Sequence, residues 1–225
     1  MSTLSAALWI AWKDLRIEAR TGEIVVTTVF FAALVAILTS LSFYIDDTTA
    51  RRIAAGVLWI SLAFSGVLAM GRSWAREREQ DVLRALLLAP IPRHAIYLGK
   101  AIGTLLFLWI VLAVLAPLVG VLYHLEPWTQ VAPAWGLLAL GSIGFVAAGT
   151  LFAAMSVQTR ARELVLSIVL FPLVAPALLA GVVATRELFN AAPLSELLGW
   201  LRIIVAADVV FIAAGLFLFE TLLSD

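Results

Sequence analysis

The sequence contains no cysteine and few charged side chains. Charged residues make up 13% of its 225 residues, whereas 63% are hydrophobic; a soluble domain usually has about 25% charged and about 45–50% apolar residues. The absence of cysteine excludes disulfides, thiolate metal sites and thiol nucleophiles. The net charge is zero, and nucleic-acid-binding proteins concentrate basic residues on one face, so we expect no nucleic-acid partner. The composition indicates that lipid is the solvent for most of the chain.

Motifs for catalysis are also missing. No GxxxxGK[ST] phosphate-binding loop occurs, because Gly99-Lys100 is followed by Ala101 and lacks the upstream glycine. Neither HExxH nor GxSxG is present, and the chain has two histidines and two lysines. We therefore expect a subunit that is not an enzyme and binds no cofactor or metal directly.

Six apolar stretches predict membrane-spanning helices. They cover approximately residues 24–45, 53–71, 101–123, 134–157, 164–184 and 203–222. Each is close to the about 20 residues that cross an about 30 Å hydrocarbon core, and helix is the form that satisfies the backbone of such runs in lipid. No internal repeat or linker is visible, so we predict one all-α polytopic membrane domain, 1–225.

The first 23 residues predict an amphipathic helix in the membrane interface. One side carries Leu4, Leu8, Ala11, Trp12 and Leu15, and the other carries Lys13, Asp14, Arg16, Glu18 and Arg20. The alternative is a helix that packs against a soluble partner. Because charges follow the apolar start instead of preceding it, we expect a retained segment and no signal peptide.

Lysine and arginine counts near the helix ends predict that both termini are cytoplasmic. Four basic residues lie on the outer side: Arg51, Arg52, Arg186 and Arg202. Eleven lie on the inner side: Lys13, Arg16, Arg20, Arg72, Arg76, Arg78, Arg84, Arg93, Lys100, Arg160 and Arg162. Six crossings agree with both termini on one side.

Several residues inside or near the spans stand out. Pro117, Pro172 and Pro176 predict helix kinks. Asp208 is a carboxylate well inside the last span, where a charge is costly; it is either a polar spot in a path or a buried residue that fixes a helix interface. Residues 186–201 predict a short helix on the periplasmic surface, with leucines at helical spacing.

His124, in the outer sequence YHLEPW, has two readings. It could ligate a haem iron, since imidazole suits iron. A single histidine beside Tyr123 and Trp128 is more typical of the aromatic belt at the membrane interface, and this is the reading we adopt.

Residues 72–100 form the longest polar interruption and predict a cytoplasmic coupling loop. Asp81 is placed to cap a short helix, 82–88, and Pro90 to end it. Leucines surrounded by charges fit docking into the groove of a soluble partner; an ordinary loop helix lying on lipid is the alternative. The predicted docking residues are Glu79, Asp81, Leu83, Arg84, Leu86, Leu87 and Pro90.

Two segments resemble a known family. The run IAAGVLWISLAFSGVLAMGRSW, followed by ERE, PIP and YLGK, and the fifth span LVLSIVLFPLVAPALLAG are similar to the haem exporter protein B family, CcmB. These are permease subunits of ABC-2-type transporters in cytochrome c maturation. The resemblance is strongest over 53–100 and 164–181. It differs at Gln80-Asp81, where the family often has Asp-Gly, and at Arg84, where Glu is common.

The resemblance implies a six-helix ABC-2 permease of the bacterial inner membrane. Leu83, Leu86, Leu87 and Pro90 would form the coupling helix that docks on the ATPase subunit CcmA, which binds ATP. Haem would be held by partners: CcmC, which handles haem with the small subunit CcmD, and the chaperone CcmE. The alternatives are a drug or glycan exporter of the same class, a secondary transporter, and a scaffold subunit that transports nothing.

Overall fold

The structure is a computed structural model that describes residues 2–42, 46–79, 86, 88, 90–156 and 162–222. Within these residues it contains seven α-helices and one single-turn π-helix, and no strand. Their bounds in chain order are α1 Thr3–Thr21, α2 Glu23–Ser42, α3 Asp47–Glu79, α5 Arg93–Leu122, η1 Pro127–Val131, α6 Ala132–Ser156, α7 Arg162–Phe189 and α8 Leu194–Leu222.

Six helices are long and apolar enough to cross a membrane, which confirms the predicted number of spans. Two of them, Thr49–Glu77 and Arg93–Leu122, extend well beyond the apolar runs 53–71 and 101–123. The charged residues next to these two apolar runs are therefore part of the helices and not of a loop. The predicted loop 72–100 shortens to the connection 80–92 between α3 and α5.

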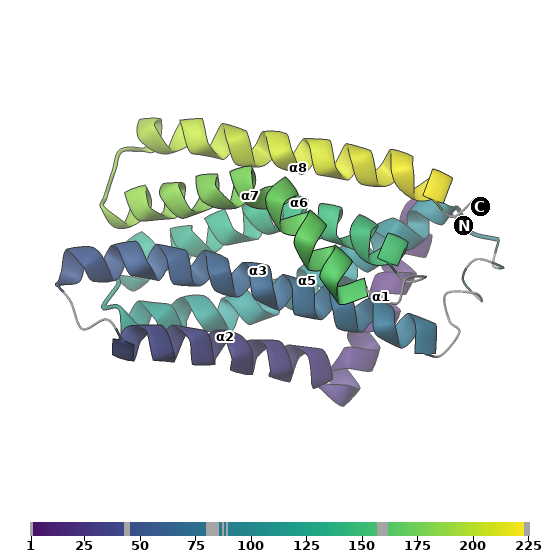
Figure 1. Ribbon diagram of the computed structural model, residues 1–225, viewed down its shortest axis with the longest axis horizontal. Helices are drawn as coiled ribbons and strands as arrows, with labels where there is room; N and C mark the ends of the chain where they lie inside the picture. The colour runs from purple at the N-terminus through teal and green to yellow at the C-terminus, as the bar shows by residue number, and fades with distance from the viewer. Residues whose placement is uncertain are drawn as a thin grey trace.

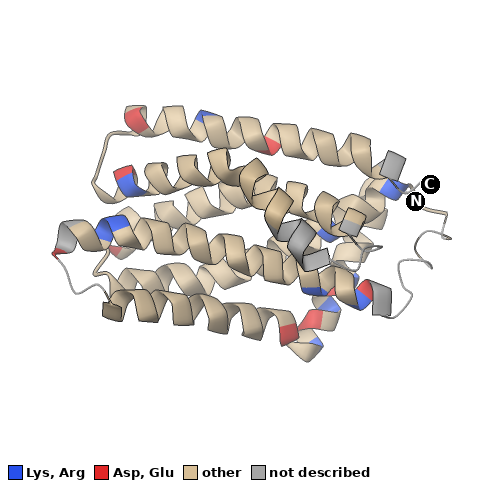
Figure 2. Ribbon diagram, viewed as in Figure 1, with Lys and Arg blue, Asp and Glu red and all other residues tan. Residues whose placement is uncertain are grey.

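The six spanning helices run side by side, and α1 crosses one end of them (Figure 1). Both termini, the end of α3 and the start of α5 lie at this end, which we call the terminal end. Charged residues gather there and at the opposite end, and the middle of the bundle is almost free of them (Figure 2). This distribution is the one that lipid requires.

Trp59 of α3 is the centre of the packing between helices. Its ring is buried and its Nε1 donates to Thr185 Oγ1 of α7 at 2.8 Å. Gly141 of α6 and Gly181 of α7 leave room for the ring, because a Cβ at either would lie within 2.4 Å of it. Small residues thus allow the helices to approach closely.

Small residues of α6 face other helices of the same chain. A Cβ at Gly149 would lie 2.3 Å from Met70 of α3, and Ala148 and Ala153 are buried. Small residues four positions apart on a helix can serve contacts between chains or packing within one chain. These residues of α6 pack within the chain.

The surface helix predicted within 186–201 is wrong. The helix α7 continues to Phe189, and α8 begins at Leu194 and runs without a break to Leu222. The periodic leucines are the first turns of α8, where Leu197 is buried beside Leu137 and Ala184. Nothing after Leu201 stops a helix, so the segment merges with the last span.

The three prolines lie inside helices, Pro117 in α5 and Pro172 and Pro176 in α7. In Figure 1 the N-terminal part of α7 is inclined to the rest of that helix. Each proline removes one backbone donor and crowds the preceding turn. Kinks at the individual prolines remain predictions.

Candidate functional site: a buried charge cluster

Lys100 lies two turns inside α5 and is 1% exposed. Its Nζ donates to Asp14 Oδ2 of α1 at 2.8 Å and to Glu77 Oε1 of α3 at 2.5 Å. Lys13 Nζ approaches the same two carboxylates, at 3.0 Å from Asp14 Oδ1 and 2.6 Å from Glu77 Oε1. We call Lys13, Asp14, Glu77 and Lys100 the Lys100 cluster. It joins three helices at the terminal end.

The charges of the Lys100 cluster cancel, two cations against two carboxylates. Taking an ion out of water costs several kcal/mol, and close pairing with hydrogen bonds offsets that cost. The Trp74 ring adds a face for the ammonium, with Lys100 Nζ 5.9 Å from the ring centroid. Burial acts to lower the pKa of Lys13, but the Asp14 and Glu77 carboxylates outweigh it and raise the pKa above 10.5.

Glu18 makes the second polar junction of this end. Its Oε1 accepts from the backbone N–H of Ile24 at 2.6 Å and of Val25 at 2.8 Å, at the start of α2. Its Oε2 lies 3.4 Å from Arg76 Nη2 of α3. A carboxylate suits this place, because the first N–H groups of a helix lack partners. One side chain therefore connects α1, α2 and α3.

The turn between α1 and α2 is a single residue, Gly22, with φ +62°. This left-handed conformation favours glycine. The N–H of Gly22 donates to Glu18 O at 2.7 Å and ends α1. The tight turn places the Glu18 side chain against the start of α2.

Small residues seat α1 on α5. A Cβ at Gly99 would lie 2.7 Å from Ile10 Cβ and 2.8 Å from Ala7 O, and a Cβ at Gly103 would lie 3.7 Å from Ala11 Cα. Such approach between helices needs small residues on both. The two glycines flank Lys100 in sequence, so the same face of α5 provides the packing and the charge.

The predicted polar side of α1 is wrong for Asp14 and Glu18. Both are buried, on the same face as Ala7 and Ala11. The exposed large apolar residues of α1 are Leu4, Leu8, Trp9 and Trp12, each between 52% and 65% exposed. The helix therefore has an apolar outer face, which suits lipid, and an inner face of alanines and carboxylates.

Most of the predicted docking residues lie outside the described residues: Asp81, Leu83, Arg84 and Leu87. Glu79 is the last residue of α3. Leu86 is half-buried and packs against the main hydrophobic core, whereas Pro90 is exposed. The described structure thus places the two legs of the connection, α3 and α5, and the Lys100 cluster between them.

Asp208 is buried in α8, and its Oδ1 accepts from the backbone N–H of Gly144 in α6 at 2.8 Å. A Cβ at Gly144 would lie 2.4 Å from that oxygen. This geometry corresponds to the second of the two readings above, a residue that fixes a helix interface.

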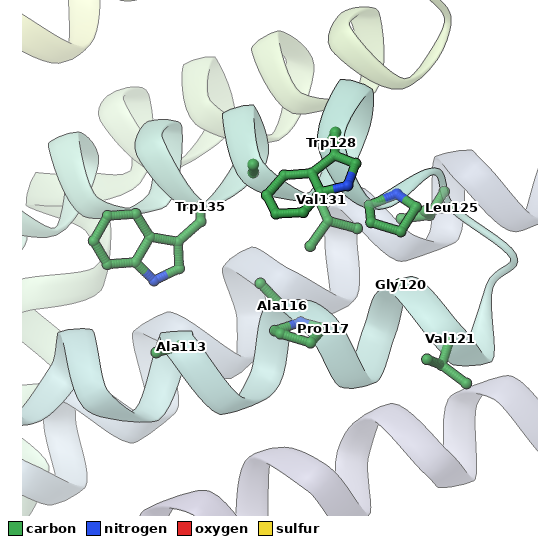
Figure 3. Close-up of a pocket in the computed structure, with 11 residues that line it drawn as sticks. Ala113, Ala116, Pro117, Gly120, Val121, Leu125, Trp128, Val131 and Trp135 are labelled. Atoms are coloured by element: carbon green, nitrogen blue, oxygen red, sulfur yellow. The ribbon is translucent and has the colours of Figure 1, made fainter.

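An apolar cavity of about 520 Å³ lies toward the opposite end, between α5, η1 and α6 (Figure 3). It is lined by Ala113, Ala116, Pro117, Gly120, Val121, Leu125, Pro127, Trp128, Val131, Ala132 and Trp135. His124 is exposed and is not among them. In the described part of the chain no three His, Asp or Glu side chains are grouped to hold a metal ion.

Six spanning helices with a charged cluster at one end define a multi-pass α-helical membrane protein. The family model described as "CcmB protein" matches residues 5–223, and the chain belongs to the CcmB family. It is 31% identical over 179 residues to heme exporter protein B of Paracoccus denitrificans, covering 78% of this chain and 80% of that protein. It is 29% identical over 204 residues to heme exporter protein B of Rhodobacter capsulatus, covering 89% and 91%.

Proposed function

We propose that this chain is the permease subunit of an ABC-type transporter complex for cytochrome c maturation in the bacterial inner membrane. It couples ATP hydrolysis by a separate ATPase subunit, CcmA, to haem handling and release of the haem-loaded chaperone CcmE. The observation that carries the proposal is the family match over residues 5–223, with relatives named heme exporter protein B.

The arrangement of α3 and α5 supports this proposal. Both helices extend past the apolar core of their spans, and the end of α3 and the start of α5 lie at the terminal end. The pairing of Glu77 with Lys100 ties the two legs together. A connection held by two stiff, joined helices transmits a push from a soluble subunit into the membrane.

The division of labour follows from the residue types. The sequence lacks a phosphate-binding loop, so ATP belongs on CcmA, and haem belongs on CcmC and CcmE, with CcmD as a small membrane partner. The chain itself is non-catalytic. The excess of basic residues near the terminal end supports a cytoplasmic location for that end and for both chain termini.

A pull-down with the cognate ATPase tests the proposal. Leu83→Asp and Leu87→Asp put a charge on the predicted docking face and should abolish ATPase binding. The matched control is Leu194→Asp, which should leave binding unchanged. Leu194 is an exposed leucine and the first residue of α8, and α8 begins at the opposite end of the bundle. Full binding and ATP-coupled activity in both loop variants would contradict docking through this face.

Co-purification separates the remaining classes. A complex with an ATPase and a haem-handling membrane subunit supports the proposal. A complex with an ATPase alone, and ATP-driven export of a drug or glycan, would indicate a different ABC-2 exporter. Ion-driven flux in liposomes that contain only this chain would indicate a secondary transporter.

A further inference from the structure

We propose that Lys100 is a positioning residue that couples α1 to the movement of α3 and α5. A displacement of the 80–92 connection between α3 and α5 is then transmitted to α2 through α1. The inference rests on the proposed function, because it describes how a push at the connection travels. It concerns no residue that binds a partner. The route consists of contacts between described side chains.

The first step joins the connection to α1. Glu77 lies two residues before the end of α3 and Lys100 lies seven residues after the start of α5. The Lys100 ammonium is shared between Glu77 and Asp14. Any movement that carries the ends of α3 and α5 must carry Asp14 with them, or separate buried opposite charges, which is strongly unfavourable away from water.

The second step joins α1 to α2. Glu18 is one turn after Asp14 on the buried face of α1, and its carboxylate binds two N–H groups at the start of α2. Gly22 is the whole linker between the two helices. A shift of α1 therefore displaces the start of α2.

The third step concerns which spanning helix can move when α1 is displaced. The side chains of α2 and α8 are mostly exposed on the bundle, with Val26, Phe30 and Val209 among them, whereas α3 and α6 are largely buried. A helix with few buried contacts moves at a lower cost than one in the core. Of the two exposed helices, α2 is the one that the Gly22 turn joins to α1, so it is the spanning helix that the route can move.

Coupling through a contact chain requires a measured interaction between its ends. The test uses spin labels on introduced cysteines, which report without background because the native chain has none. One pair, Leu8→Cys with Ile60→Cys, measures α1 against α3. A second pair, Val26→Cys with Met155→Cys, measures α2 against the largely buried α6. All four positions are exposed.

The variants distinguish a loss of coupling through the Lys100 cluster from a loss of folding. Lys100→Met alone leaves Asp14 and Glu77 with one cation fewer, so it could fail to fold. The triple variant Asp14→Asn, Glu77→Gln, Lys100→Met removes the three buried charges together and leaves Lys13, whose side chain is 35% exposed and reaches water. A neutral replacement of a buried ion set is often tolerated. Lys100→Arg keeps the charge and serves as rescue. Arg186→Met, at the opposite end, controls for loss of a cation.

The first readout needs only this chain in lipid nanodiscs, diluted with unlabelled chain. In the wild type, Lys100→Arg and Arg186→Met the α1–α3 distance distribution should be narrow. In the triple variant it should broaden and lose its narrow component. An equally narrow distribution in a folded triple variant would overturn the inference, and it would do so whether or not the proposed function is correct.

The second readout uses the complex with its ATPase, with and without trapped ATP. In the wild type, trapping should shift the α2–α6 distance. The triple variant should still bind the ATPase and hydrolyse ATP but lose that shift. A shift retained in the triple variant would overturn the route. Absence of ATPase binding to the wild type would instead contradict the proposed function, and the α1–α3 distance would still decide the role of Lys100.

Discussion

Lys100 and Asp14 are 86 positions apart in the chain, and their side chains meet at 2.8 Å in the buried junction of α1 and α5. The contact holds a helix that does not span the membrane against one that does. Glu77 completes it from α3. Three helices are thus fixed at the end that carries the 80–92 connection, and the predictions below follow from this junction and from the packing beneath it.

Replacing Lys100 with methionine should lower the free energy of unfolding by about 3–5 kcal/mol, because two buried carboxylates lose their closest cation. The exposed cation Arg16 provides the comparison, since Arg16→Met should change stability by less than about 1 kcal/mol. Thermal unfolding of the purified protein in detergent measures both. Equal small effects would show that Lys100 is not held as an ion pair.

Replacing Glu18 with glutamine should cost about 1–2 kcal/mol, because the charge facing the start of α2 and its ion pair with Arg76 are lost, while one acceptor oxygen remains. Glu18→Ala should cost more, since two N–H groups then lack an acceptor. Glu126→Gln, an exposed position, is the control and should be near neutral. Unfolding in denaturant compares the three, and a neutral Glu18→Ala would contradict the capping role.

Gly141→Ala and Gly136→Ala form a matched pair on α6. The first places a methyl group 2.4 Å from the Trp59 ring and should destabilise by about 1–3 kcal/mol. The second meets nothing within 4 Å and should be neutral or stabilise by up to about 1 kcal/mol, since alanine favours helix. Melting temperatures that fall equally in both variants would contradict the packing around Trp59.

Strongly alkaline pH should loosen α1. The pKa of Lys13 is raised above 10.5 in the folded protein, so the stabilisation from its charge is present below 10.5 and is lost as pH rises through the folded value. Melting temperature should therefore show no Lys13-dependent loss from pH 7 to 10, and a loss above that range. Lys13→Arg keeps its charge there and should lose less; identical alkaline profiles would contradict this assignment.

The sequence predicts the spans well because long apolar runs have one stable form in lipid. It underestimates the lengths of α3 and α5, because Glu77 and Lys100, taken singly, are charged residues typical of a loop. In the structure the two charges pair and both helices continue past them. The separate surface helix at 186–201 is wrong for a related reason: periodicity identifies a helix but says nothing of whether it merges with the next span.

The Lys100 cluster is missed because its members come from three distant segments and none belongs to a known motif. A signal does exist: Gly99 and Gly103 flank Lys100, and Ala7 and Ala11 precede Asp14 at the same four-residue spacing. Two small-residue faces, each with one buried charge of opposite sign, match each other. The docking face at 82–88 remains a prediction from the sequence.

Binding of the cognate ATPase to the purified complex, measured for the wild type, Leu87→Asp and Leu194→Asp, tests the central claim most directly. The account predicts that the ATPase binds the wild type and Leu194→Asp alike, and that Leu87→Asp loses both binding and ATP-driven release of the haem-loaded chaperone. Wild-type protein that binds no ATPase, or Leu87→Asp that retains full binding and release, would contradict it.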